Sequence, residues 1–278
     1  MEFRITTLIE NNRDDQNELY YEHGLSLLIE ADGKHILFDT GQSGDFIKNA
    51  ELMEHNLENL DYVIISHGHY DHSGGFEKLV KKLNKVPPLI VGEEFFKPKY
   101  KKISGHEYRF NGNSFDEKFI IQNGIILNKV NEDIRYLTNH IIVFHHFQKR
   151  NDFEKQNSKF LIKENSSYVT DGFDDEIAIG IVTKKGLAVV VGCSHVGLIN
   201  ILNSITERIN IPIYAVIGGT HLIEAEKIRI QETINSLKNM KIQLIAVSHC
   251  TGDEGISDIC KEFKEKFIYN NTGNVIVI

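Results

Sequence analysis

The stretch Ser66-His67-Gly68-His69-Tyr70-Asp71-His72-Ser73-Gly74-Gly75 places three histidines and one aspartate directly after the apolar run Tyr62-Val63-Ile64-Ile65. Imidazole nitrogens and carboxylate oxygens are the ligands that zinc and related divalent ions prefer. A single histidine at a strand end is more often a hydrogen-bonded surface or core residue than a metal ligand. Four ligand-type residues at alternating positions are hard to explain in that way. The stretch therefore predicts a metal site, and it carries enough ligands for two ions.

A repeated pattern puts further histidines at the ends of strands. Apolar segments are followed by a histidine and then by a helix-like segment at 62–65 before His67 and His69, 187–191 before His195, 213–217 before His221, and 242–247 before His249. Continuous apolar strands that alternate with helices predict an α/β fold in which helices cover the faces of sheets. Ligands in such folds gather at the carboxyl ends of the strands. We therefore expect these histidines to converge on a shared site.

The remaining segments are consistent with one domain over residues 1–278. Residues 3–10 predict a strand, and 25–30 with 35–38 predict a hairpin because Asp32-Gly33 is a typical turn between them. A helix is predicted around 46–51. The segment at about 85–170 holds aromatic and charged residues in short runs, which we interpret as strands and loops that include a covering insertion.

Composition indicates a globular protein without a membrane segment. The chain has 278 residues, of which 41% are hydrophobic and 25% charged, an ordinary balance. Its apolar runs fall short of the roughly 20 residues that a membrane helix needs. The N-terminus enters a strand-like pattern without a signal-peptide core, and three cysteines are too few for a disulfide framework. We therefore expect a cytoplasmic protein with no membrane partner.

The charge of the chain disfavours nucleic acid as a partner. The net charge is −8, whereas nucleic-acid binding draws most of its affinity from clustered lysine and arginine. A local basic stretch contains Lys97, Lys99, Lys101 and Lys102. Such runs are usually solvated, but this one could meet an anionic substrate. We expect a small-molecule substrate of anionic character, while the oligomeric state stays open.

The quoted residues resemble a known family. His67-Gly68-His69-Tyr70-Asp71-His72 is similar to the HxHxDH signature of the metallo-β-lactamase superfamily, Asp39 in Phe38-Asp39-Thr40-Gly41 matches its first motif, and His249 matches its last. The resemblance implies a four-layer αβ/βα sandwich of the metallo-β-lactamase type that carries two divalent ions. These ions would be zinc by preference, with Mn, Fe or Mg as alternatives.

A narrower resemblance points to one subgroup. Its members are named metal-dependent hydrolases or 7,8-dihydropterin-6-yl-methyl-4-(β-D-ribofuranosyl)aminobenzene 5'-phosphate synthases. The segments that resemble it are His23-Gly24-Leu25-Ser26, Ser66 to Gly75, Gly192-Cys193-Ser194-His195, Gly218-Gly219-Thr220-His221-Leu222 and His249-Cys250-Thr251-Gly252.

The resemblance also assigns roles to individual residues. It implies that His67, His69 and His195 bind one ion and that Asp71, His72 and His249 bind the second. Asp39 would then hydrogen-bond to the histidine loop and orient it. The chain departs from the family at Cys193, because many members place a bridging aspartate after this strand. Cys193 is either a thiolate ligand or a small buried apolar residue.

Two further residues are candidates for the substrate pocket. His221 lies at a strand end but matches no general motif of the superfamily, so we expect it in the pocket and not among the metal ligands. Asp175 precedes the apolar run at 177–179. It either reaches the pocket or belongs to a solvated turn, which is the commoner case.

These expectations predict a metal-dependent hydrolase. A divalent ion lowers the pKa of bound water from 15.7 to about 7, so a metal-held hydroxide could attack an ester or phosphoester, with Asp71 orienting it or accepting its proton. The alternative is a transferase that condenses a dihydropterin pyrophosphate with a ribofuranosylaminobenzene 5'-phosphate. An iron-based oxygen or NO reductase is disfavoured because His69 stands where such proteins carry glutamate. A non-catalytic metal-binding module is disfavoured because the ligand positions of the opening stretch are filled.

Overall fold

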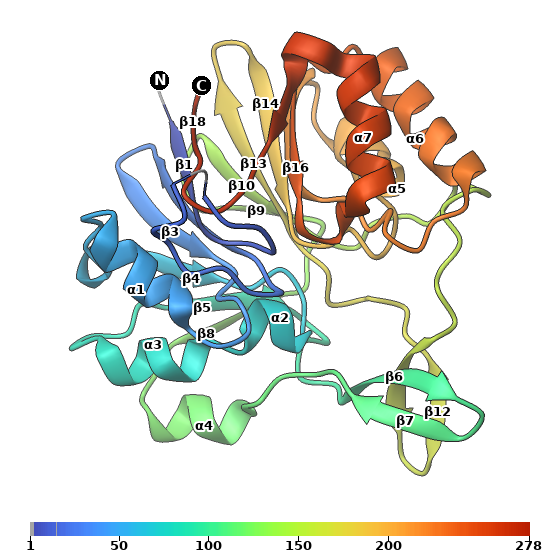
Figure 1. The fold of residues 1–278 in the computed structure, drawn as a ribbon. Coiled ribbons are helices and arrows are strands. Elements are labelled where there is room, and N and C mark those ends of the chain that lie inside the picture. Colours follow the sequence, from blue (N-terminus) through green and yellow to red (C-terminus); the bar gives the residue numbers. More distant parts are fainter. Residues whose placement is uncertain (1–2, 15) are drawn as a thin grey trace.

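The computed structural model describes residues 3–14 and 16–278, and within them the chain forms two seven-stranded sheets and one four-stranded sheet (Figure 1). The first large sheet has the strand order β18 (Val275–Val277), β1 (Arg4–Ile9), β2 (Ser26–Ala31), β3 (Lys34–Phe38), β4 (Tyr62–Ile64), β5 (Leu89–Gly92) and β8 (Leu127–Val130). Strands β3, β4, β5 and β8 run parallel to one another. Their carboxyl ends therefore meet at the same edge.

The second large sheet is built in a similar way from the other half of the chain. Its strand order is β17 (Phe267–Tyr269), β16 (Leu244–Ser248), β15 (Ile213–Gly219), β14 (Gly186–Val191), β13 (Ala178–Thr183), β10 (Ile141–Phe144) and β9 (Ile134–Tyr136). Strands β14 to β17 are parallel to one another. Strand β13 pairs with β14 in antiparallel orientation, and β10 pairs with β13 in the same way. The amino end of β13 consequently lies at the same edge as the carboxyl end of β14.

Helices cover the outer faces of both sheets (Figure 1). The helices are α1 (Asp45–Leu52), α2 (Tyr70–Ser73), α3 (Phe76–Lys82), α4 (Glu117–Gln122), α5 (Leu198–Arg208), α6 (Lys227–Asn239) and α7 (Gly252–Phe263), with short 3-10 turns η1 (Leu57–Asn59), η2 (His249–Thr251) and η3 (Lys264–Lys266). One apolar core lies between the two sheets and contains residues of both, such as Ile64 and Val190. A core packs each sheet against its own helices, around Phe76 in one case and Leu202 in the other. The layers are thus helix, sheet, sheet and helix.

The small sheet projects from this sandwich (Figure 1). Its strand order is β12 (Ser167–Thr170), β11 (Phe160–Glu164), β6 (Lys99–Ser104) and β7 (Glu107–Phe110). All pairings within it are antiparallel. Between β7 and β11 the chain returns to the sandwich, where β8 joins the first large sheet and β9 and β10 join the second.

The predicted α/β class and four-layer sandwich are confirmed. The hairpin forms as predicted between β2 and β3, with Asp32 and Gly33 in the left-handed conformation that its turn requires. The helix expected directly after His67 is instead divided into α2 and α3 at Gly74-Gly75. Helix α4 was not expected, and it begins where the Asp116 side chain accepts a hydrogen bond from the Phe119 amide.

No helix among the described residues is long and apolar enough to cross a membrane.

Candidate metal centre

The histidine-bearing loops leave the carboxyl ends of strands at one edge of the sandwich. His67 follows β4, while His195, His221 and His249 follow β14, β15 and β16. Several residues of these loops that are not glycine adopt left-handed backbone conformations with φ between 48° and 61°: Asp39, Ser194, His221 and His249. Each such residue costs about 1–3 kcal/mol, and conformations of this kind concentrate at functional sites. The fold therefore maintains backbone strain where the candidate ligands meet.

His67, His69 and His195 form the first group of metal-type donors, which we call the histidine cluster. The Nε2 atom of His67 lies 3.0 Å from Nδ1 of His69. Two nitrogens bound to one tetrahedral zinc ion lie about 3.3 Å apart, given Zn–N bonds of about 2.0–2.1 Å. The Nε2 atom of His195 is buried without a hydrogen-bond partner among the described residues. An orphaned buried nitrogen beside such a pair fits a bound metal ion.

The histidine cluster is held in the neutral form that binds metal ions. Burial lowers the pKa of His67, His69 and His195 well below the ordinary value, and neighbouring cationic side chains add to this effect. The ring of His195 also stacks on Phe173 with 4.0 Å between ring centroids. An incoming ion would therefore meet three neutral, positioned imidazoles.

Asp71, His72, Cys193 and His249 form the second group, which we call the mixed cluster. Nε2 of His72 lies 3.1 Å from Sγ of Cys193, and Oδ2 of Asp71 lies 3.4 Å from Nε2 of His249. All four residues are at most 6% exposed. This donor set of one carboxylate, two imidazoles and one thiol suits zinc. Cys193 thus lies among the candidate ligands, which favours the thiolate-ligand alternative over that of a small buried apolar residue.

Asp39 connects the mixed cluster to the histidine loop. Its Oδ2 atom lies 2.6 Å from Nδ1 of His72 and accepts a hydrogen bond from the Ser66 hydroxyl, which in turn lies 3.0 Å from Nδ1 of His67. Although burial disfavours the charged form of His72, the carboxylates of Asp39 and Asp71 raise its pKa to about 9. Without an ion, the mixed cluster therefore carries a proton on His72 at neutral pH.

Buried carboxylates also hold the backbone of the ligand loops. The carboxylate of Glu176 accepts hydrogen bonds from the amides of His195 and Val196, at 2.8 and 2.9 Å. Glu10 accepts one from the amide of His249, at 3.2 Å. Burial raises the pKa of Glu176 to about 7, against the opposing effect of the two amides. These contacts fix where the loops place His195 and His249.

Asp175 lies behind the histidine loop and not in the substrate pocket or a solvated turn, so both sequence interpretations of this residue need correction. One oxygen accepts a hydrogen bond of 2.7 Å from the Gly68 amide, and the other lies 2.9 Å from Nζ of Lys99. Lys99 is itself buried and also bonds to Asp171. Gly68 must be glycine here, because a Cβ atom would lie 2.5 Å from the Phe95 carbonyl oxygen.

Both clusters open onto a cavity of about 510 Å³, a volume typical of small-molecule sites. The small sheet and its adjoining loop supply one wall, with Lys101, Arg109, Phe110, Asn111 and Phe160. His221 lines the cavity as expected from its place in the sequence, and its ring centroid lies 4.2 Å from that of His195. The basic stretch is thus divided, since Lys101 faces the cavity while Lys99 is buried.

Several residues at this site received no role from the sequence. His23 lies in a quoted motif, and its Nε2 atom is 3.2 Å from Oδ2 of Asp71, a contact that raises the pKa of His23. The sequence around Glu10 and Glu176 shows only that each lies next to a predicted strand, so it does not indicate that they hold the ligand loops. Cys250 directly follows the predicted ligand His249, and this position could have suggested that it also belongs to the site. The wall residue Arg109 comes from a hairpin whose packing the local sequence does not reveal.

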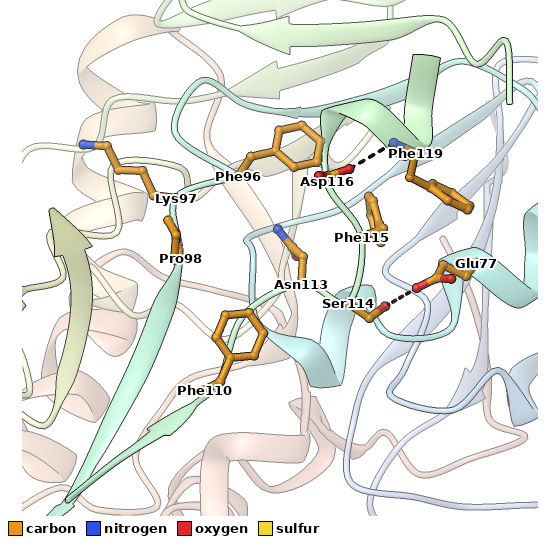
Figure 2. Close-up of a pocket in the computed structure, with 10 residues that line it drawn as sticks. All are labelled: Glu77, Phe96, Lys97, Pro98, Phe110, Asn113, Ser114, Phe115, Asp116 and Phe119. Atoms are coloured by element: carbon orange, nitrogen blue, oxygen red, sulfur yellow. Dashed lines mark hydrogen bonds between the residues drawn. The ribbon is translucent and has the colours of Figure 1, made fainter. Parts of the chain in front are cut away.

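A second cavity of about 400 Å³ lies between α3, α4 and the base of the small sheet (Figure 2). Its wall is aromatic, with Phe96, Phe110, Phe115 and Phe119. The polar groups around it are largely paired, as in the hydrogen bond from the Ser114 hydroxyl to Glu77 (Figure 2). Phe110 lines both cavities, but the donor clusters line only the first.

The chain is similar to known proteins over most of its length. The chain is 32% identical to the 7,8-dihydropterin-6-methyl-4-(beta-D-ribofuranosyl)-aminobenzene-5'-phosphate synthase of Methanocaldococcus jannaschii, over 98% of this chain and 96% of that protein. A crystal structure of a metal-dependent hydrolase of the β-lactamase superfamily superposes with a TM-score of 0.86 and 28% identity, covering 99% of this chain and 98% of the other.

More distant structures share the fold. The metallo-beta-lactamase fold protein YhfI of Bacillus subtilis has a TM-score of 0.58 at 12% identity, with all of both chains covered. The family model of the metallo-beta-lactamase superfamily matches residues 20–180, which is more than half of the chain. The chain belongs to the metallo-β-lactamase superfamily.

Proposed function

We propose that the chain is a metal-dependent hydrolase that acts on an ester or phosphoester-type small molecule. The observation that carries this proposal is the pair of adjacent donor clusters that open onto one cavity. Paired metal sites of this kind suit reactions in which an attacking and a leaving oxygen must both be stabilised. Membership of the superfamily supports the presence of divalent ions.

Each of the two clusters would hold one metal ion. His67, His69 and His195 would hold one ion, and Asp71, His72, Cys193 and His249 the other. When bound, such ions lower the pKa of coordinated water from 15.7 to about 7 and polarise the substrate oxygen. Asp71 would orient the attacking water or accept its proton. Orientation is the better supported role, because although burial opposes it, His72, His23 and His249 hold the pKa of Asp71 well below its ordinary value.

The cavity wall favours an anionic substrate with an apolar part. Lys101 and Arg109 supply positive charge to the wall, and Glu224 offsets part of it because its carboxylate lies 3.4 Å from Nζ of Lys101. Tyr70 and Phe160 supply aromatic surface. Arginine and lysine bind phosphate oxygens through charge-assisted hydrogen bonds. His221 lies beside both Phe160 and His195, with centroid distances of 5.7 and 4.2 Å, and it would donate a hydrogen bond to the substrate.

A second candidate function is the transfer reaction named for the Methanocaldococcus jannaschii relative. The identity of 32% over nearly the whole of both chains favours it. The same donor clusters would then serve as Lewis acids for a pyrophosphate leaving group. The two candidates share their metal ligands and differ in whether water or an aminobenzene derivative is the second reactant.

One experiment separates the two candidates. The zinc-loaded protein is assayed with bis(p-nitrophenyl) phosphate, phosphomonoesters and lactones, and separately with a dihydropterin pyrophosphate plus a ribofuranosylaminobenzene 5'-phosphate. The His67→Ala variant serves as the test variant, and His106→Ala, at an exposed turn of the small sheet, serves as the control. Turnover of a hydrolytic substrate that is lost only in His67→Ala supports the hydrolase. Condensation without hydrolysis would replace it with the transferase.

A further inference from the structure

A third group of metal-type donors lies beside the two clusters. The ends of β14, β15 and β16 bring Cys193, His221 and Cys250 together so that one donor atom from each lies within 4.8 Å of the others. The two cysteines are 3% and 5% exposed. Cys193 also belongs to the mixed cluster, whereas His221 and Cys250 belong to neither cluster.

The His221 side chain has polar atoms that lack partners. Both ring nitrogens, Nδ1 and Nε2, are buried without a hydrogen-bond partner among the described residues. A buried polar atom without a partner destabilises the fold, so native structures rarely keep two on one ring without a ligand. The backbone amide of His221 approaches Sγ of Cys250 at 3.3 Å, which holds the two residues side by side.

The surrounding backbone leaves space for the Cys250 thiol. Gly219 lies at the end of β15, and a Cβ atom there would stand only 2.6 Å from Sγ of Cys250. Any larger residue at this position would displace the thiol. Cys193, His221 and Cys250 all line the main cavity, so a hydrated ion could reach them from solvent.

We propose that Cys193, His221 and Cys250 form a third metal site for a thiophilic ion such as Zn²⁺, Cd²⁺ or Cu⁺. Two thiolates and one imidazole are a donor set that such ions select over harder cations. Donors around a tetrahedral zinc ion lie about 3.5–3.8 Å apart, so side-chain shifts of about 1 Å at most would close the site. The thiol protons leave to solvent when the ion binds.

The thiolate of Cys193 then bridges the third site and the mixed cluster. A shared thiolate reduces the repulsion between neighbouring cations because its charge lies between them. The third ion would also keep Cys193 deprotonated for the mixed cluster. Cys250 lies outside both clusters, but by binding the third ion it would help to keep Cys193 deprotonated for the mixed cluster.

The test is a titration of the reduced full-length protein with Cd²⁺ alone. Bound cadmium is counted by elemental analysis after gel filtration, and thiolate ligation is read from the ultraviolet thiolate-to-cadmium charge-transfer band. Wild type is compared with Cys250→Ser and with the matched control Cys260→Ser, whose cysteine is exposed on α7. His221→Gln provides a second test that keeps both thiols.

We expect one equivalent fewer in Cys250→Ser and in His221→Gln than in wild type, with Cys260→Ser unchanged. The charge-transfer band should fall by about two-thirds in Cys250→Ser, because two of the three thiolate–cadmium bonds are lost with the third ion. Equal stoichiometry and equal bands in Cys250→Ser and Cys260→Ser would overturn the third site.

A further variant separates this site from the proposed function. His67→Ala should lose the ion of the histidine cluster while it keeps the thiolate band. If His67→Ala loses no ion, the proposed function fails, and the comparison of Cys250→Ser with Cys260→Ser still decides the third site. Circular dichroism of each variant checks that the fold is retained.

Discussion

The histidine cluster and the mixed cluster lie side by side and draw on the same six-residue loop, His67 to His72, yet they differ in charge. The histidine cluster consists of imidazoles whose pKa values burial lowers. The mixed cluster contains a carboxylate, a thiol and a histidine whose pKa is raised to about 9. One cluster is therefore ready for an ion at neutral pH, whereas the other must first release protons.

The difference arises from what each cluster packs against. Phe173 lies against the rings of the histidine cluster and stacks on His195, so it helps to bury this cluster. Asp39 instead bonds to His72 and stabilises its protonated ring. The Asp39 carboxylate therefore has two effects on His72. It orients the ring for metal binding, and it stabilises a ring proton that competes with the ion.

The largest effect should come from removal of a histidine-cluster ligand. His67→Ala should abolish ion binding at this cluster and lower kcat by about 10³-fold or more, because metal ions supply several kcal/mol of transition-state stabilisation. Elemental analysis and steady-state kinetics check this, with His106→Ala as the control. Full turnover in a His67→Ala protein that holds no metal would contradict the mechanism.

The second prediction concerns pH and separates the two clusters. Because His72 is protonated below about pH 9, its proton must leave when the mixed cluster binds an ion. The apparent affinity of the mixed cluster should therefore rise about tenfold per pH unit between pH 7 and pH 9, or about a hundredfold in all. Zinc titrations at several pH values measure this slope.

The slope also reports on Cys193. Burial raises the pKa of the Cys193 thiol, so ligation as a thiolate would release a further proton and steepen the dependence. The histidine cluster should show no slope from its own ligands over the same range. Equal slopes for the two ions would contradict the contrast between the clusters.

The third prediction tests how Asp39 supports the mixed cluster. At pH 9 or above, where the His72 proton no longer competes, Asp39→Asn should weaken ion binding there by about 10- to 100-fold, as loss of an outer carboxylate partner generally does. Asp258→Asn, at a partly exposed position of α7 where the carboxylate pairs with Lys261, is the matched control. Competition with a chromophoric chelator measures both variants. Unchanged ion affinity in Asp39→Asn would show that Asp39 does not support ion binding by the mixed cluster.

The smallest effect on metal binding should come from Glu176. In Glu176→Gln, one of the amides of His195 and Val196 loses its acceptor, which should lower the free energy of unfolding by about 1–3 kcal/mol. Ion binding by the histidine cluster should weaken only a few-fold, since His195 keeps its stacking on Phe173. Denaturant unfolding with and without zinc measures both effects.

The parts of this centre that the sequence predicts are local. His67 to His72 lie in one loop, and the strand ends before His195 and His249 are visible because apolar runs precede them. The α/β class follows from the same alternation of strands and helices, whereas the four-layer sandwich was implied by the family resemblance. Those signals need no knowledge of distant contacts.

The supporting residues were not predictable because their partners are distant in sequence. Lys99 lies in a basic stretch that is typical of a solvated face, but Asp171 and Asp175, 72 and 76 residues away, bury it. Glu10 reaches His249 across 239 residues. The division of the 85–170 segment between three sheets likewise depends on strand pairings that no local pattern indicates.

The most direct test of the account is a crystal structure of the zinc-loaded protein with anomalous difference maps recorded at the zinc edge. We expect one peak within bonding distance of His67, His69 and His195 and another within bonding distance of Asp71, His72, Cys193 and His249. At lower pH the second peak should lose occupancy before the first. A map without density at the histidine cluster, or with the order of loss reversed, would contradict the account.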